Sequence, residues 1–218
     1  MRLAYINGIS SIDGISALCF SCQDRRITRG IADYPPIPFG NLTIAGACTE
    51  EILQATTFFH LAAKFERSTL PQPTSRFLSG CIGQYLRYCP MCFAKQRIQH
   101  YLLFWRFFML TCCCQHKCQL LKTCGYCDGL IPLFTAPFKL GYCSICLQRL
   151  KLCSPALVTD EAELDAAQRI QGDILFLLAP QLWEVDSKNI IKHVGQRLAD
   201  LRQARHLTYS KYVMQVKP

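Results

Sequence analysis

The sequence predicts a mainly α-helical fold with small ribbon-like β elements in its centre. Apolar residues recur at helical spacing in segments before residue 81 and after residue 153. Between these segments, cysteines occur in pairs separated by two residues, a spacing typical of tight turns. Half of the 218 residues are hydrophobic and 18% are charged, which excludes a wholly disordered chain.

The first predicted helix spans Glu50 to Phe65, with Thr49 as its candidate N-cap and acidic residues in its first turn. Its apolar face consists of Ile52, Ala55, Phe59 and Ala62. Prolines before and after it indicate irregular connections.

Two further helices are predicted after the cysteines. One begins after Thr159, where acidic residues fill the first turn, and ends before Pro180. Its apolar side consists of Leu164, Ala167, Ile174, Leu175 and Leu178. The other begins at Ser187 and places Ile190, Val194, Leu198 and Leu201 at helical spacing.

Fifteen cysteines are several times the usual share for a chain of this length. The central segment holds four candidate ligand pairs: Cys89 with Cys92, Cys113 with His116, Cys124 with Cys127, and Cys143 with Cys146. Two intervening residues let a tight turn aim both ligands at one tetrahedral ion, with Pro90, Gly125 and Gly141 in or beside the turns. The sequence therefore predicts zinc-ribbon-like β elements and two structural zinc sites between helical segments, one with three cysteines and a histidine, the other with four cysteines.

Other roles for the cysteines fit the pattern less well. A secreted disulfide protein has a signal peptide and an even number of cysteines, whereas this N-terminus is interrupted by polar residues and the count is odd. A redox dithiol needs only one pair, and buried unligated cysteines need no regular spacing. We expect a soluble, cytoplasmic protein without a membrane span.

The positive charge is concentrated where the cysteines are. Residues 81–153 contain nine basic side chains and one acidic, a net of +8, whereas residues 1–80 have +1 and residues 154–218 have zero. Seven thiolates and two zinc ions would add −7 + 4 = −3 and leave about +5. Such a segment favours acidic partners, and the candidate phosphate contacts are Arg87, Lys95, Arg97, Lys117 and Lys122. A solvated basic face is the alternative.

The motif Arg87-Tyr88-Cys89-Pro90-x-Cys92, followed by Tyr101 and Trp105, resembles the TniQ (TnsD-type) family of transposition proteins. As in that family, Trp105 stands eight residues before Cys113, and Cys124 follows His116 by eight. The resemblance is specific from about residue 87 to residue 178. A weaker one covers Arg2 to Ser10, which is similar to the middle of a helix-turn-helix at the family's N-terminus.

This resemblance implies a non-enzymatic adaptor that links target DNA, or a DNA-targeting complex, to an AAA+ transposition ATPase. By position, Cys89, Cys92, Cys113 and His116 would form the first zinc site, and Cys124, Cys127, Cys143 and Cys146 the second. For the third ligand of the first site, Cys113 has the right spacing, but Cys112, Cys114 or Cys118 could substitute. With the cysteine-rich segment as its centre, the chain divides into a helical region (1–80, partly helix-turn-helix-like), a double zinc-binding TniQ core (81–153) and a C-terminal helical region (154–218).

Two alternative functions remain: a zinc-dependent DNA-binding transcriptional regulator, and a non-functional fragment of a longer selector, since the chain begins in the middle of the N-terminal motif. No phosphate loop, dinucleotide fingerprint or carboxylate cluster points to an enzyme.

We expect Trp105 and the apolar residues beside it to pack against the zinc sites rather than to bind a partner. Gly195 to Thr208 resembles the first helix and turn of a repressor-like helix-turn-helix, but an amphipathic packing helix is the favoured interpretation.

Overall fold

The computed structural model describes residues 34, 43, 49–65, 77–133, 139–180 and 187–215, with side chains of the last segment described from residue 188 to residue 204. The α-helices whose bounds are described are α4 (Glu50–Ala55), α5 (Phe59–Lys64), α6 (Pro90–Lys95), α7 (Glu161–Leu178) and α8 (Ser187–Gln215), and short 3₁₀ helices span Ser79–Cys81, Leu103–Arg106 and Leu150–Leu152. The strands β1 (Cys112–Cys113) and β2 (Cys118–Gln119) form a two-stranded antiparallel sheet. The described part is thus mostly helical with a small sheet, as the sequence predicts.

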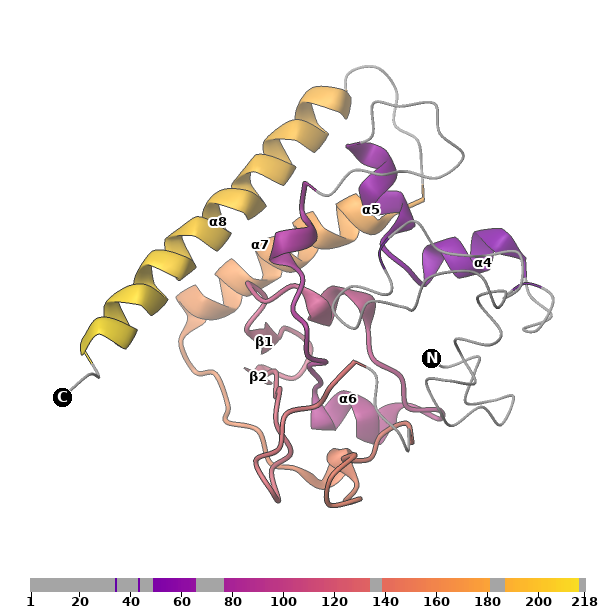
Figure 1. Cartoon of the computed structure of the whole chain (residues 1–218), viewed down its shortest axis with the longest axis vertical. Helices are drawn as coiled ribbons and strands as arrows, with labels where there is room; N and C mark the ends of the chain where they lie inside the picture. Colours follow the sequence, from indigo (N-terminus) through magenta and orange to yellow (C-terminus); the bar gives the residue numbers. More distant parts are fainter. Residues whose placement is uncertain are drawn as a thin grey trace, which may run out of the picture.

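The long helices α7 and α8 lie side by side above the cysteine-rich segment, with α5 near one end and α6 on the far side of the sheet (Figure 1). Contacts join α7 to α5, α8 and β1. Arg197 of α8 also binds Asp173 of α7, with Nε donating to Oδ2 at 2.9 Å. Among the described helices, none has the length and apolar character needed to span a membrane.

The predicted helix from Glu50 to Phe65 is two short helices. The hydroxyls of Thr56 and Thr57 donate to the carbonyls of Leu53 and Gln54, at 2.8 and 3.0 Å, and this local bonding competes with helix continuation. The predicted apolar face is wrong in part: Ile52 is 53% exposed, whereas Leu53, Phe58, Leu61 and Ala62 are buried. The break at Thr56 changes the register, which periodicity across the whole segment misses.

The two C-terminal helices are found where the sequence predicts them. Asp160 is the N-cap of α7, and its Oδ1 accepts from the Ala162 N–H at 2.9 Å. The buried positions of α7 are Ala167, Ile174 and Leu177. Those of α8 are Ile191, Val194, Gly195 and Leu198, while Ile190 is exposed. Because α8 continues to Gln215, the chain does not turn at Thr208, and the helix-turn-helix interpretation of this segment is wrong.

An aromatic core lies inside the cysteine-rich segment and packs α6 against the loop that carries Trp105. Phe93 of α6 stacks on Tyr88 at a centroid distance of 5.4 Å and packs edge-on against Tyr101 at 5.1 Å. It also lies 6.1 Å from Trp105. Trp105 is 1% exposed, so it is a core residue, which agrees with the packing interpretation.

Arg106 is buried beside this core, with its guanidinium Nε and Nη2 donating to the Gly83 carbonyl at 3.1 and 2.9 Å. Its own carbonyl accepts from the Gly83 N–H at 2.8 Å. The guanidinium also lies over the Phe58 ring, 5.9 Å from the centroid. The buried charge thus joins the start of the cysteine-rich segment to the α4–α5 connection.

Three of the four ligand pairs lie on turns of the same shape. In each turn the residue after the second ligand has a positive φ: Lys117 at 47°, Asp128 at 53° and Leu147 at 59°. The Asp128 and Leu147 N–H groups donate back to the Cys124 and Cys143 carbonyls at 2.9 and 3.1 Å. A short antiparallel pairing closes each turn: Cys113 with Cys118, Thr123 with Leu130, and Tyr142 with Arg149. The fourth pair is different, because Cys89 is the N-cap of α6 and Pro90 its first residue.

We expect Leu147→Gly to raise the thermal unfolding midpoint of the metal-loaded protein. A left-handed conformation costs a branched residue about 1–2 kcal/mol, and the extra chain entropy of glycine offsets about 0.5–1 kcal/mol of the gain. Because Leu147 is 59% exposed, little burial is lost. The net gain of about 0.5–1 kcal/mol corresponds to a rise of about 1–4 °C for a chain of this size, measurable by calorimetry. Leu147→Val should lower the midpoint, and a glycine variant less stable than the parent would contradict this account of the turn.

Candidate metal centres

The first cluster brings together the side chains of Cys89, Cys92, Cys113 and His116, whose ligand atoms all lie within 4.8 Å of one another. The Cys92 and Cys113 sulfurs are 3.7 Å apart. His116 turns its Nδ1 toward the thiols, at 3.6 Å from Cys89, 3.3 Å from Cys92 and 3.6 Å from Cys113. The N-terminus of α6 supplies the first two ligands, and the hairpin from β1 to β2 supplies the other two.

The second cluster brings together Cys124, Cys127, Cys143 and Cys146, again with all four sulfurs within 4.8 Å. The Cys124 and Cys146 sulfurs are 3.6 Å apart, and those of Cys127 and Cys143 are 3.7 Å apart. Two equivalent turns face each other across these contacts. Cys127 is exposed, whereas the three cysteines of the first cluster are buried.

Both clusters have the dimensions of a tetrahedral zinc site. With Zn–S bonds of ~2.3 Å and Zn–N bonds of ~2.0–2.1 Å, neighbouring sulfurs lie about 3.8 Å apart and a sulfur and a nitrogen about 3.5 Å apart. The distances of 3.6–3.7 Å between sulfurs and 3.3–3.6 Å from sulfur to Nδ1 fall close to these values. Thiolates with imidazole, and four thiolates, are also the donor sets that zinc prefers in structural sites. The two clusters can therefore hold metal ions, and four protein ligands in each leave no open position for catalysis.

Backbone N–H groups point at the sulfurs, as expected for sites built to carry thiolate charge. The Tyr126 and Ile145 amides donate to the Cys124 and Cys143 sulfurs at 3.5 and 3.4 Å. At the first cluster the Cys92 amide donates to Cys89 at 3.4 Å. Hydrogen bonds from Cys113 and Cys92 lower the pKa of the Cys89 thiol.

The alternative ligands of the first cluster lie in different surroundings. Cys112 precedes Cys113 on β1, and neighbouring side chains of a strand point to opposite faces, whereas Cys114 lies in the turn that follows the strand. Burial raises the pKa of the Cys112 thiol to about 11, so this residue behaves as an apolar side chain. Cys118 is buried with its sulfur 3.6 Å from Cys89, but it is not one of the four residues whose ligand atoms lie together.

One cysteine that sequence reasoning left without a role borders the second cluster. The Gly125 amide donates to the Cys153 sulfur at 3.3 Å, next to Cys124. A side chain on Gly125 would meet this sulfur at 3.2 Å, so the glycine permits the close approach. The spacing of Cys153 in the sequence does not distinguish it, because its contact with Gly125 depends on the chain returning to the Cys124–Cys127 turn.

The five candidate phosphate contacts differ in exposure. Lys95 and Arg97 lie at and after the end of α6, Lys117 lies on the turn of the first cluster, and Lys122 follows the sheet; all four are exposed. Arg87 is half-buried, and its guanidinium donates to the carbonyls of Trp105 (2.9 Å), Phe108 (3.4 Å) and Phe107. Its charge therefore supports the loop that carries Trp105.

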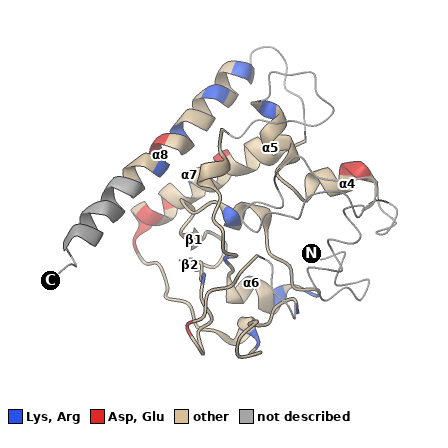
Figure 2. Ribbon diagram, viewed as in Figure 1, with Lys and Arg blue, Asp and Glu red and all other residues tan. Residues whose placement is uncertain are grey.

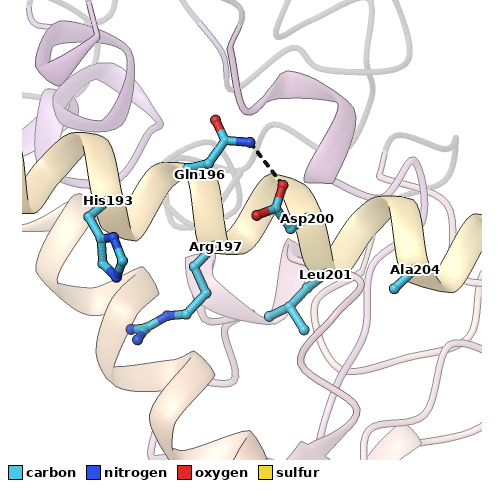
Figure 3. Close-up of a pocket in the computed structure, with 6 residues that line it drawn as sticks. All are labelled: His193, Gln196, Arg197, Asp200, Leu201 and Ala204. Carbon is cyan, nitrogen blue, oxygen red and sulfur yellow. Dashed lines mark hydrogen bonds between the residues drawn. The ribbon is translucent and has the colours of Figure 1, made fainter.

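A hollow of about 410 Å³ lies away from both clusters, along α8 (Figure 3). It is lined by His193, Gln196, Arg197, Asp200, Leu201 and Ala204, with Gln196 donating to Asp200 at 2.8 Å. No residue predicted from the sequence as a ligand or a phosphate contact lines it. Asp173 on the neighbouring helix binds Arg197 and raises the pKa of its guanidinium.

Comparison with known proteins identifies a family. No curated protein matches the chain. The family model for TniQ matches residues 1–120, which include the four residues of the first cluster and end before Cys124. The matched part also contains Arg2 to Ser10, which lies outside the described residues. Because this match covers more than half of the 218 residues, the chain belongs to the TniQ family and has a role associated with DNA transposition.

Proposed function

We propose that this chain is a non-enzymatic target-site selection adaptor in DNA transposition. It links target DNA, or a DNA-targeting complex, to an AAA+ transposition ATPase. The observation that carries the proposal is the TniQ match, which spans residues 1–120 and contains the whole first cluster. Two closed clusters and a basic central segment support a binding role rather than a catalytic one.

In this proposal both clusters hold structural Zn²⁺. Cys89, Cys92, Cys113 and His116 ligate the first ion, with Cys113 as third ligand because its sulfur faces both Cys92 and His116. Cys124, Cys127, Cys143 and Cys146 ligate the second. The ions supply folding free energy, since the turns are too short to be stable alone.

The exposed basic residues Lys95, Arg97, Lys117 and Lys122 are the proposed contacts to DNA phosphates. Phosphate contacts supply affinity and position without reading sequence. In this scheme a targeting partner or another part of the complex supplies target choice, and Arg87 supports the fold.

Metal content tests the ligand assignment. The parent chain should carry two zinc ions in native mass spectrometry, and Cys127→Ser should carry one, because a three-ligand site loses affinity. The matched control is Cys114→Ser, which changes a half-buried thiol outside both clusters and should keep two ions. Retention of both ions in Cys127→Ser, or loss of one in Cys114→Ser, would overturn the assignment. Chelation of the parent chain should also abolish its cooperative thermal transition.

The salt dependence of DNA binding tests the basic residues. Lys95→Gln combined with Lys117→Gln should weaken binding to any duplex equally and reduce the slope of log affinity against log salt by about 2. The control pair, Lys188→Gln with Lys192→Gln, changes two exposed lysines of α8 and should leave the slope unchanged. Fluorescence anisotropy at several salt concentrations gives both quantities. Equal slopes for the two double variants would exclude these phosphate contacts.

A bridging assay tests the adaptor function itself. The AAA+ ATPase encoded in the same mobile element is added to bead-bound target duplex, or to a bead-bound targeting complex, with and without this chain. Retention of the ATPase that depends on this chain is the expected result. Binding of the chain to DNA without the ATPase would favour a transcriptional regulator, and no binding to either would favour a fragment without function.

A further inference from the structure

A further thiol lies beside the first cluster without belonging to its four ligands. The Cys118 sulfur is 3.6 Å from the Cys89 sulfur, and Cys118 has no exposed surface. In the part of the chain that the structure describes, it is the one cysteine outside the clusters whose sulfur makes a hydrogen-bonding contact with a cluster sulfur. Sulfurs within the second cluster are also 3.6 Å apart, so Cys118 is already as far from Cys89 as one ligand is from another.

The register of the two-stranded sheet directs Cys118 toward the cluster. Cys118 on β2 pairs with Cys113 on β1, and Cys113 is one of the four cluster residues. Directly opposed residues of an antiparallel pair have their side chains on the same face, with Cβ atoms about 4.5–5.5 Å apart. Cys112, the residue before Cys113, points to the other face. The register and the contact with Cys89 therefore place the same thiol beside the cluster.

The backbone of Cys118 is held on both sides. On one side β2 pairs with β1. On the other, the Gln119 N–H donates to the Ala156 carbonyl at 2.9 Å, and the Val158 N–H donates to the Lys117 carbonyl at 2.8 Å. Because these bonds do not involve the cluster residues, the Cys118 side chain stays beside the cluster when a ligand is lost. A change of side-chain rotamer is then the main movement needed to bring its sulfur into the vacant position.

Exchange of Cys89 for Cys118 preserves the donor set and its charge. Three thiolates and one imidazole are a set that zinc prefers in structural sites, and the exchange replaces one thiolate with another. With a divalent ion, three negative charges stand against two positive ones in both arrangements, a net of −1. The basic residues Lys117, directly before β2, and Lys122, shortly after it, offset this charge in either case (Figure 2).

The second cluster has no equivalent neighbour among the described residues. Cys153 borders it, but the Cys153 sulfur accepts from the Gly125 N–H at 3.3 Å and makes no hydrogen-bonding contact with a ligand sulfur. The two clusters therefore differ in one respect that an experiment can isolate: the first has a buried thiol in contact with a ligand, and the second does not.

We propose that Cys118 is a reserve ligand of the first metal centre, which takes the place of Cys89 when that thiolate is lost. The spacing in the sequence makes Cys118 an alternative to Cys113, whereas the structure places its sulfur next to Cys89. The first centre thus keeps its ion after losing one thiolate, and the second centre does not. This inference rests on the zinc binding proposed above and adds a fifth residue that can hold the ion.

Native mass spectrometry of the zinc-loaded full chain tests the exchange. Cys89→Ser should keep two ions, in contrast to Cys127→Ser at the second cluster. Serine is suited to position 89 because it is a good N-cap for α6, where the Cys92 N–H donates to the Cys89 sulfur at 3.4 Å. Cys89→Ser combined with Cys118→Ser should keep one ion, because no fourth ligand remains.

Two controls accompany these variants. Cys118→Ser alone should keep two ions, because Cys118 is not a ligand of the intact centre. Cys89→Ser combined with Cys112→Ser should also keep two. Cys112 is matched to Cys118, since both thiols have no exposed surface and lie on the same sheet, but Cys112 points away from the face that carries Cys113.

Cobalt substitution counts the thiolates, because Co²⁺ binds the same nitrogen and sulfur ligands and each cobalt–thiolate bond adds near-ultraviolet charge-transfer absorption. The parent has seven ligating cysteines in its two clusters. Cys89→Ser should give the same absorption as the parent, since Cys118 restores the seventh thiolate. Six-sevenths of that absorption would mean that the serine oxygen or water occupies the position instead.

The outcomes separate the reserve role from the zinc sites themselves. One ion in Cys89→Ser, or two ions with six thiolates, would overturn the reserve role and leave the zinc sites intact. Two ions in the Cys89–Cys118 double variant, an ion lost from Cys118→Ser alone, or equal losses in the two double variants would overturn it as well. Fewer than two ions in the parent would overturn the proposed zinc sites and the reserve role with them.

Discussion

The approach of seven thiols and one imidazole in two groups of four is the constraint on which the rest of this structure depends. Ligands of the first group lie on α6 and on the hairpin from β1 to β2, and those of the second lie on two separate turns. Strands of two residues and a helix of six residues are too short to be stable alone. Sulfur atoms at 3.6–3.7 Å gain little from one another, whereas a shared ion would bind them strongly and fix the turns. The aromatic core can then pack on turns that are already fixed.

The sequence predicts the pairs well because their geometry is local. Two residues between ligands is a property of the turn itself, and the structure gathers all eight predicted residues. The choice among Cys112, Cys113, Cys114 and Cys118 is not local, since it depends on which sulfur lies beside Cys92 and His116 in the folded chain. Spacing alone leaves this choice open.

Helix prediction succeeds where one pattern is continuous and fails where local side-chain hydrogen bonds interrupt the helix. Helix α7 follows its pattern because Asp160 caps a continuous segment up to Leu178. The segment from Glu50 to Phe65 does not, because Thr56 and Thr57 bond back to the preceding turn and interrupt it. Left-handed residues such as Leu147 and Lys117 are also missed, since glycine and asparagine are the usual residues at such positions. In this chain the hydrogen bonds and antiparallel pairings that close each turn override local preference.

The two clusters differ in their surroundings, and this difference bears on the proposed role. Around the first, Tyr88, Phe93 and Trp105 form a closed aromatic core, and the family match contains this part of the chain. The second has an exposed cysteine and apolar turns facing solvent. The two are joined rigidly, because Tyr88 pairs with Leu121 through reciprocal 2.9 Å hydrogen bonds and α6 packs against residues 150–152. If the basic residues near the first cluster bind DNA as proposed, the second cluster has a fixed position relative to that DNA, because the fold and not a linker joins the two clusters. An adaptor of this kind acts by holding two partners in a fixed geometry, which requires rigidity between the sites and no chemistry at either one.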